Sequence, residues 1–172
     1  MPRATDIHVE DVTYSYEEFI YRTPIKFGGV AVDRATNLNV ECVVGTAAGR
    51  QAVGFGSMPL GNVWSFPSRV LGYDATLAAM KALAERVARI MADCEIVGHP
   101  IDLTWSVESA YMNAAREVSY ERKLAEPIPP LCTLVVASAF DAALHDGFGK
   151  VHGLNCYHTY GPDFMTHDLG HY

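Results

Sequence analysis

The fold is decided by residues 37–44, NLNVECVV, in which apolar and polar side chains alternate. Leu38, Val40 and Cys42 fall on one side of the extended chain, and Asn39 and Glu41 fall on the other. A period of two is typical of a strand with one buried face. This stretch therefore predicts a half-buried strand at the centre of a small sheet.

The chain on either side of this strand predicts two partners for it. Residues 46–50, TAAGR, form a short turn with a glycine, and an apolar segment returns at 51–55. Another short strand is expected at 8–14. Together these segments predict a three-stranded antiparallel meander. Gly54 and Gly56 stand where the third strand ends, which indicates a bulge or a close approach of another backbone.

Two long segments, 17–34 and 57–73, interrupt the strands and are predicted to be loops. Both carry large apolar side chains, namely Phe27, Met58, Trp64 and Phe66. Loops of this length in a compact domain are usually lids or binding loops. The alternative is that these side chains pack back onto the core of the domain itself, and the sequence favours neither reading.

Three helices are expected after the strands. The first begins with Asp74 as its cap and ends near Gly98. The second begins at Pro100 and ends before Pro127. The third covers 131–151 and is apolar nearly all round, which predicts burial on several sides. Strands followed by a bundle of about three helices give an α+β fold.

The composition excludes several classes of function. The chain of 172 residues has a net charge of −7, which argues against a nucleic-acid partner. The start of the chain has no apolar run, and the apolar stretches look too short to span a membrane. No CxxC spacing is present, so we expect free, buried thiols in a reducing compartment at Cys42, Cys94, Cys132 and Cys156. These features predict a cytoplasmic protein without a membrane or nucleic-acid partner.

Two pairs of side chains could carry chemistry. His167 and His171 are four residues apart and could share a metal on a helix, but Gly170 makes a stable helix there doubtful. Asp141 and Asp146 lie in the apolar third helix, where a spacing of five turns them about 140° apart. Structural hydrogen bonds or a salt bridge are therefore expected for the carboxylates rather than paired acid–base catalysis. We assign no catalytic and no metal-binding residue.

Three places in the sequence resemble a known domain when taken in order. The strands carry Val44-x-Thr46-x-x-Gly49 and Gly54-x-Gly56, with Pro59 after them, and a proline at position 24 falls in the first loop. The strongest match is 139–146, AFDAALHD, followed by Gly149-Lys150-x-x-Gly153 and Gly161. Residues 6–161 resemble the amino-terminal capping domain of the enolase superfamily, in its mandelate racemase and muconate lactonizing enzyme branch. Ser57, His145 and Asn155 depart from the pattern and leave the substrate class open.

The resemblance implies a cap over a (β/α) barrel. Residues 1–161 would form the capping domain, and 162–172 would be a tail or the start of a linker into a barrel that this chain lacks. In that family the barrel supplies the acid–base residues and the carboxylate ligands of Mg²⁺, and the reaction removes a proton next to a substrate carboxylate. We therefore expect an isomerase or lyase (a racemase, dehydratase or cycloisomerase) acting on a small carboxylate such as a sugar acid. The chain alone should be inactive and bind no metal, with the barrel supplied in cis or by a separate chain.

The resemblance also assigns substrate contacts to the two loops. Lys26 and Phe27 would lie in the first loop, and Met58 and Trp64 in the second. Lys26 could point at an anionic substrate group, or it could be an ordinary exposed lysine. An apolar face that meets no barrel should also promote self-association, so a homo-oligomer is expected. Two other readings stay open: a non-enzymatic binding or association module of the same fold, and an unrelated α+β protein.

Overall fold

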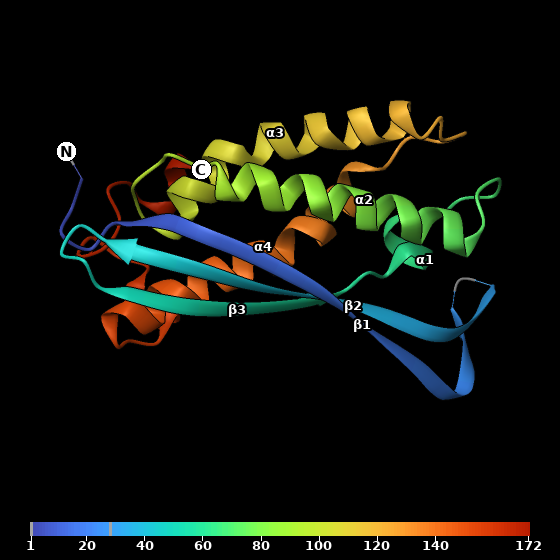
Figure 1. Ribbon diagram of the computed structural model, residues 1–172, viewed down its shortest axis with the longest axis horizontal. Helices are drawn as coiled ribbons and strands as arrows, with labels where there is room; N and C mark the ends of the chain where they lie inside the picture. Colours follow the sequence, from blue (N-terminus) through green and yellow to red (C-terminus); the bar gives the residue numbers. More distant parts are fainter. Residues whose placement is uncertain (1, 28) are drawn as a thin grey trace.

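The computed structural model describes residues 2–27 and 29–172. Three strands come first: β1 (Ile7–Phe27), β2 (Val30–Thr46) and β3 (Gln51–Pro59). They pair antiparallel in the order β1-β2-β3, which confirms the predicted meander (Figure 1). The helices α1 (Asn62–Ser65), α2 (Tyr73–Ala92), α3 (Pro100–Glu121) and α4 (Pro130–His152) follow and confirm the α+β class. Two short 3₁₀ helices come last, η1 (Cys156–Thr159) and η2 (Leu169–His171).

One face of β2 forms the floor of the core. Leu38, Val40 and Cys42 are buried, whereas the intervening Glu41 is exposed, as the alternation predicts. The helix α4 packs along β2 and β3, and α2 and α3 pack against α4 and against each other. The molecule is therefore a small sheet with a helix bundle on one face.

Two glycines of β3 let α4 pack directly on the strand backbone. A Cβ atom at Gly54 would lie 1.9 Å from the carbonyl oxygen of Ala143, and one at Gly56 would lie 2.0 Å from that of Ala139. Real Cβ atoms do not approach other atoms so closely. The close backbone approach expected at these glycines is confirmed.

The prediction of a loop at residues 17–34 is wrong. Strand β1 continues to Phe27 and β2 starts at Val30, so the two strands form a long hairpin that extends beyond the helices (Figure 1). The β-branched and aromatic side chains of this segment favour strand pairing. Pro24, which cannot donate a ladder hydrogen bond, falls in the irregular stretch between Ile20 and Ile25 where the register shifts. The segment therefore remains a hairpin despite its proline.

The helices begin and end close to where they are predicted. Helix α2 begins at Tyr73 rather than after Asp74, and it ends at Ala92, six residues before the predicted end near Gly98. Gly98 instead exchanges two backbone hydrogen bonds of 3.0 Å with Ile7. Helix α3 begins at Pro100 as predicted. The second predicted loop, 57–73, is shorter than expected, since β3 extends into it and α1 occupies part of it.

Helix α4 forms the centre of the core. It is long and apolar enough to cross a membrane by length and composition, which differs from the expectation from sequence. In the folded protein 61% of its most apolar stretch is buried, and Phe140 and Leu144 are covered by the sheet and the other helices. The core helix of a soluble domain passes the same test. The predicted burial on several sides is confirmed for most of the helix, whereas Leu131 and Leu134 in its first turns are exposed.

The structure also shows the surroundings of the four cysteines and of the residues after Gly161. All four cysteines are free thiols; three are buried, as predicted, and Cys156 is partly exposed. The residues after Gly161 pack against the domain: Met165 is buried, Arg3 Nη1 donates to the carbonyl oxygen of Pro162 at 2.6 Å, and Tyr172 Oη donates to Asp102.

Candidate functional site

An apolar hollow of about 250 Å³ lies where the far end of the β1–β2 hairpin meets the segment around α1. The hairpin contributes Tyr21, Ile25 and Phe27, and α1 contributes Val63 and Trp64. We call this cavity the hairpin hollow. Two segments far apart in the sequence therefore meet here, and they are the two segments in which substrate contacts were predicted.

The structure brings two of the four predicted contact residues together. Phe27 and Trp64 both line the hairpin hollow, and they remain 49% and 42% exposed. Large aromatic side chains with this much exposure are available to a ligand or to another protein surface. Phe66 behaves differently, because it is buried in the core of the domain. The alternative that these side chains pack onto the core is therefore confirmed for Phe66, while the role of Phe27 and Trp64 as binding residues stays a prediction.

The other two predicted residues do not line the hairpin hollow. Successive side chains of a strand point to opposite faces, so Lys26 faces away from the side on which Ile25 and Phe27 line the hollow. Met58 lies in β3 opposite Leu38 and packs partly buried against the core. The structure therefore separates Lys26 and Met58 from the aromatic pair.

Sequence reasoning missed the charged group of this cavity, Arg34. Its Nη2 atom donates to Asp74 Oδ1 at 2.5 Å, and its guanidinium carbon lies 4.8 Å from the centre of the Tyr73 ring. Asp74 raises the pKa of Arg34, so the guanidinium stays charged. Burial raises the pKa of Tyr73, whose hydroxyl donates to the carbonyl oxygen of Arg34 at 3.3 Å. An anionic ligand in the hollow would find its cation here rather than at Lys26.

A buried amide fixes α1 and hence the position of Trp64. The Nδ2 atom of Asn62 donates to the carbonyl oxygen of Tyr73 at 2.8 Å and to Thr76 Oγ1 at 2.9 Å. These bonds join α1 to the first turn of α2. The indole of Trp64 folds over Gly61, where a Cβ atom would lie 2.1 Å from its Nε1 atom. Trp64 is therefore connected, through α1, to the first turn of α2.

A larger hollow of about 700 Å³ adjoins the first. It shares Asn62, Val63 and Tyr73 with the hairpin hollow, and it is lined further by residues such as Arg69 and Glu126. Both cavities lie at the end of the molecule that carries the hairpin turn. This end therefore offers a continuous recessed surface with charged groups at its border.

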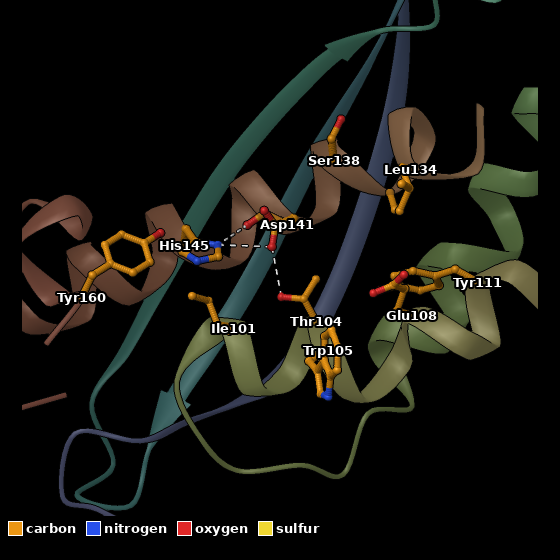
Figure 2. A pocket seen from close by; sticks show the side chains of 11 residues that line it. Ile101, Thr104, Trp105, Glu108, Tyr111, Leu134, Ser138, Asp141, His145 and Tyr160 are labelled. Carbon is orange, nitrogen blue, oxygen red and sulfur yellow. Dashed lines mark hydrogen bonds and ion pairs between the residues drawn. The ribbon is translucent and has the colours of Figure 1, made fainter. Parts of the chain in front are cut away.

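A third cavity, of about 460 Å³, lies between α3 and α4, and we call it the helix groove (Figure 2). Here Thr104 Oγ1 donates to Asp141 Oδ1 at 3.0 Å. His145 Nδ1 lies 3.0 Å from the backbone oxygen of Asp141 and 3.3 Å from its Oδ1 atom. Burial alone would raise the pKa of Asp141, but the hydrogen bonds from His145 and Thr104 bring it below its usual value. Burial alone would lower the pKa of His145, and Asp141 raises it.

The two aspartates of α4 have separate partners, as the helical spacing predicts. Asp146 Oδ2 accepts a hydrogen bond of 2.8 Å from the backbone nitrogen of Phe55 and lies 2.7 Å from Lys150 Nζ. It therefore ties α4 to β3, while Asp141 ties α4 to α3. The prediction of structural hydrogen bonds and a salt bridge is confirmed for both carboxylates.

The residues of this chain do not form a magnesium site in the part that the structure describes. No three His, Cys, Asp or Glu side chains gather there closely enough to hold a metal ion. The rings of His167 and His171 stack with their centres 4.0 Å apart.

Comparison with known proteins identifies the fold. No family model matches the chain, and no curated protein matches it in sequence. A dipeptide epimerase from Enterococcus faecalis, solved with magnesium and the dipeptide L-Leu-L-Tyr, matches with a TM-score of 0.51 and 15% identity, over 90% of this chain and 35% of that chain. The L-Ala-D/L-Glu epimerase from Bacillus subtilis matches with a TM-score of 0.48 and 17% identity, over 90% of this chain and 34% of that chain.

An enolase from Bradyrhizobium, solved with magnesium and mandelic acid, has a TM-score of 0.47 and 15% identity, over 86% of this chain and 33% of that chain. The chain thus spans about a third of the length of the enolase-superfamily proteins that it matches. The match to the dipeptide epimerase, at a TM-score of 0.51 and 15% identity, shows a shared fold alone. That fold is the one that the sequence motifs indicate.

Proposed function

We propose that this chain is the capping domain of an enolase-superfamily enzyme of the mandelate racemase and muconate lactonizing type. The enzyme would remove the proton next to a substrate carboxylate, as a racemase, dehydratase or cycloisomerase, and we propose a sugar acid as the substrate. The proposal is supported by the fold shared with about a third of the dipeptide epimerase. A (β/α) barrel, in the same polypeptide or in another, would supply the acid–base residues.

The observation that carries the proposal is the meeting of Phe27 and Trp64 at the hairpin hollow. In an enzyme of this plan the cap closes the mouth of the barrel and keeps water from the reacting atoms. Exposed aromatic side chains at the free end of a hairpin and on a short helix that is hydrogen-bonded to α2 are suited to covering the barrel mouth and excluding water. Arg34, held by Asp74, adds a fixed positive charge that favours an anionic substrate.

The four residues predicted to contact the substrate would have different roles in this proposal. Phe27 and Trp64 would contact the substrate or close over it. Lys26 would have to reach the substrate from the opposite face of the hairpin, and Met58 would contribute through its packing against the core. Magnesium, held by the barrel, would stabilise the negative charge that develops when the proton leaves.

The proposal is tested on the protein produced from its own gene. A tag on this chain should recover a (β/α) barrel of about 250 residues, fused to it or bound to it. In that assembly, Trp64→Ala should lower kcat/KM for the carboxylate substrate by about tenfold, because part of the cover is lost. Trp105→Ala removes a comparably exposed tryptophan of α3 that lies outside the hairpin hollow, and it serves as the control.

Two results would contradict the proposal. One is the recovery of this chain with no barrel in any polypeptide. The other is an assembly in which Trp64→Ala and Trp105→Ala lower kcat/KM equally. The first result would favour the non-enzymatic binding or association module of the same fold.

A further inference from the structure

The last part of the chain is held to the first turn of α3 at two points. Residues 156–172, which we call the terminal segment, contain the short helices η1 and η2. His99, the cap of α3, contacts Thr159 near one end of the segment, and Asp102 accepts a hydrogen bond from Tyr172 at the other end. Within the segment Thr159 and Met165 are buried, and the other residues are exposed or partly exposed. A segment with so little buried surface opens more readily than the core of a domain.

His99 contacts the terminal segment through a neutral imidazole ring. The side chain is fully buried, its Nδ1 atom accepts from the backbone nitrogen of Ile101 at 3.3 Å, and its Nε2 atom lies 3.4 Å from Thr159 Oγ1. Thr159 Oγ1 itself donates to the carbonyl oxygen of Cys156 at 2.5 Å, so it accepts from Nε2. A ring with one accepting and one donating nitrogen is neutral. The contact between α3 and the segment therefore needs His99 without a charge.

Protonation of His99 would break this arrangement. Both nitrogens of an imidazolium ring are donors, so Nδ1 would meet the N–H group of Ile101 as a second donor. The charge would also lie at the amino-terminal end of α3, where the helix dipole disfavours a cation. The ring is enclosed by Phe148 and by the neutral phenol of Tyr160, with ring centres 4.8 and 5.6 Å away. A protonated His99 would therefore have to leave this position to reach water.

The charged groups around His99 do not offset this cost. On α4, burial lowers the pKa of His145 but Asp141 raises it above its usual value, and its ring centre lies 6.1 Å from that of His99. His145 is thus already charged in the pH range in which His99 would take up a proton. On α3, Asp102 favours a charged His99, but its carboxylate already accepts from the His99 backbone nitrogen at 3.1 Å and from Tyr172. Burial and His145 outweigh Asp102 and lower the pKa of His99 to about 4.

From this geometry we infer that the terminal segment is an acid-released strap: protonation of His99 frees the segment from α3 while the sheet and the helix bundle stay folded. Release removes Tyr160 from the wall of the helix groove (Figure 2). It also removes Tyr172 from Trp105, whose ring centre lies 5.8 Å from that of Tyr172. The groove is then open at this end. The inference goes beyond the proposed capping role and does not depend on it.

The test is amide hydrogen exchange of the 172-residue chain, corrected for the intrinsic exchange rate at each pH. The amides of Ile101 and His158 report on release, because they bond to His99 Nδ1 and to the carbonyl oxygen of Asn155. The amide of Val40, in the buried part of β2, reports on unfolding of the whole domain. At pH 7, Ile101 and His158 should be less protected than Val40. Their opening constant should rise about twentyfold between pH 7 and pH 5, because the pKa of His99 is about 4 in the closed state and about 6.5 in the open state.

Three variants complete the test. His99→Asn can cap α3 but cannot titrate, so the twentyfold rise should be lost. His158→Asn removes an exposed histidine of η1 and should leave the rise unchanged. Thr159→Val removes the acceptor of the His99 bond at a similar volume, so it should raise the opening constant at pH 7 about fivefold and keep the pH dependence. Circular dichroism shows whether each variant is folded.

Several results would overturn the inference. Equal protection of Ile101, His158 and Val40 would mean that the terminal segment opens only with the whole domain. An opening constant that does not rise below pH 7, the same rise in a folded His99→Asn, or its loss in a folded His158→Asn would remove His99 as the trigger. If His99→Asn does not fold, Thr159→Val decides the question, because an unchanged opening constant at pH 7 would show that the contact does not hold the segment.

Discussion

The backbone carbonyl of Ala139 in α4 faces Gly56 in β3 so closely that a Cβ atom on the glycine would lie 2.0 Å from its oxygen. The same helix meets Gly54 one turn further along. At these two glycines β3 and α4 are thus in contact through their backbones, without side chains between them. This contact fixes the distance between the sheet and the bundle.

The first prediction follows from this contact. Gly56→Ala should lower the free energy of unfolding by about 3 kcal/mol or more, because α4 must move away from β3 to admit a methyl group. Gly161→Ala is the matched control, since nothing lies within 4 Å of a Cβ atom there. Urea unfolding measures both. A loss that is the same for the two variants would contradict the packing.

The second prediction concerns the unpaired hydroxyl of Tyr111. Tyr111→Phe should raise the free energy of unfolding by about 1 kcal/mol, because a buried polar group without a partner is removed. Tyr16→Phe should lower it by about 1 kcal/mol, since the Tyr16 hydroxyl donates to the carbonyl oxygen of Lys81 at 3.1 Å. The midpoints of denaturant unfolding distinguish the stabilised Tyr111→Phe variant from the destabilised Tyr16→Phe variant. A destabilised Tyr111→Phe would show that the hydroxyl is already paired.

The third prediction concerns pH. His99 is fully buried, its Nδ1 atom accepts from the backbone nitrogen of Ile101 at 3.3 Å, and its Nε2 atom lies 3.4 Å from Thr159 Oγ1. Burial, with His145 nearby, lowers the pKa of His99 to about 4 from the usual 6.5. The unfolded chain therefore binds the proton more readily than the folded chain does. The contribution of His99 to stability should fall as the pH drops from about 6.5 and should level off below about 4.

The size of this effect is up to about 3 kcal/mol, from the shift in pKa between the two states. His99→Asn keeps a residue that can cap α3 but cannot titrate, so the loss of stability between pH 6.5 and 4 should be smaller in the variant. Urea midpoints at a series of pH values provide the measurement. Parallel pH profiles for the wild type and the variant would rule out His99 as the cause.

The fourth prediction concerns self-association. The hairpin exposes several large apolar side chains, among them Ile20, Ile25 and Phe27, and we expect the isolated chain to form oligomers through them. Phe27→Ser should shift the sedimentation profile toward the monomer. Phe55→Ser is the control, because Phe55 is equally exposed, at 49%, but lies on β3 away from the hairpin turn. A wild-type chain that sediments as a monomer at high concentration would contradict the expectation.

The sequence predicts the parts of the fold that have one buried face. Leu38, Val40 and Cys42 alternate with polar residues because α4 covers only one side of β2. The hairpin gives no such signal, since both of its faces are open and Ile20 is 88% exposed. Its pairing comes from the backbone ladder, as between Ile20 and Arg34, and a pattern of buried and exposed side chains does not show such pairing.

The same distinction between local sequence patterns and distant contacts applies to the residues of the candidate site. Phe27 and Trp64 could be predicted because aromatic residues in long connecting segments stand out in the sequence. Arg34 could not, because its role depends on Asp74, which is 40 residues away in the chain. The helix groove depends on how α3 and α4 pack, so the unpaired atoms of Tyr111 and His145 become visible only in the folded structure.

The most direct test of the capping role is the exchange of the proton next to the carboxylate of candidate substrates in D₂O with magnesium, followed by proton NMR. Our account predicts no exchange with the 172-residue chain alone and exchange with the assembly that contains the barrel. Reproducible exchange by the chain alone, at a rate above that of the buffer, would contradict it.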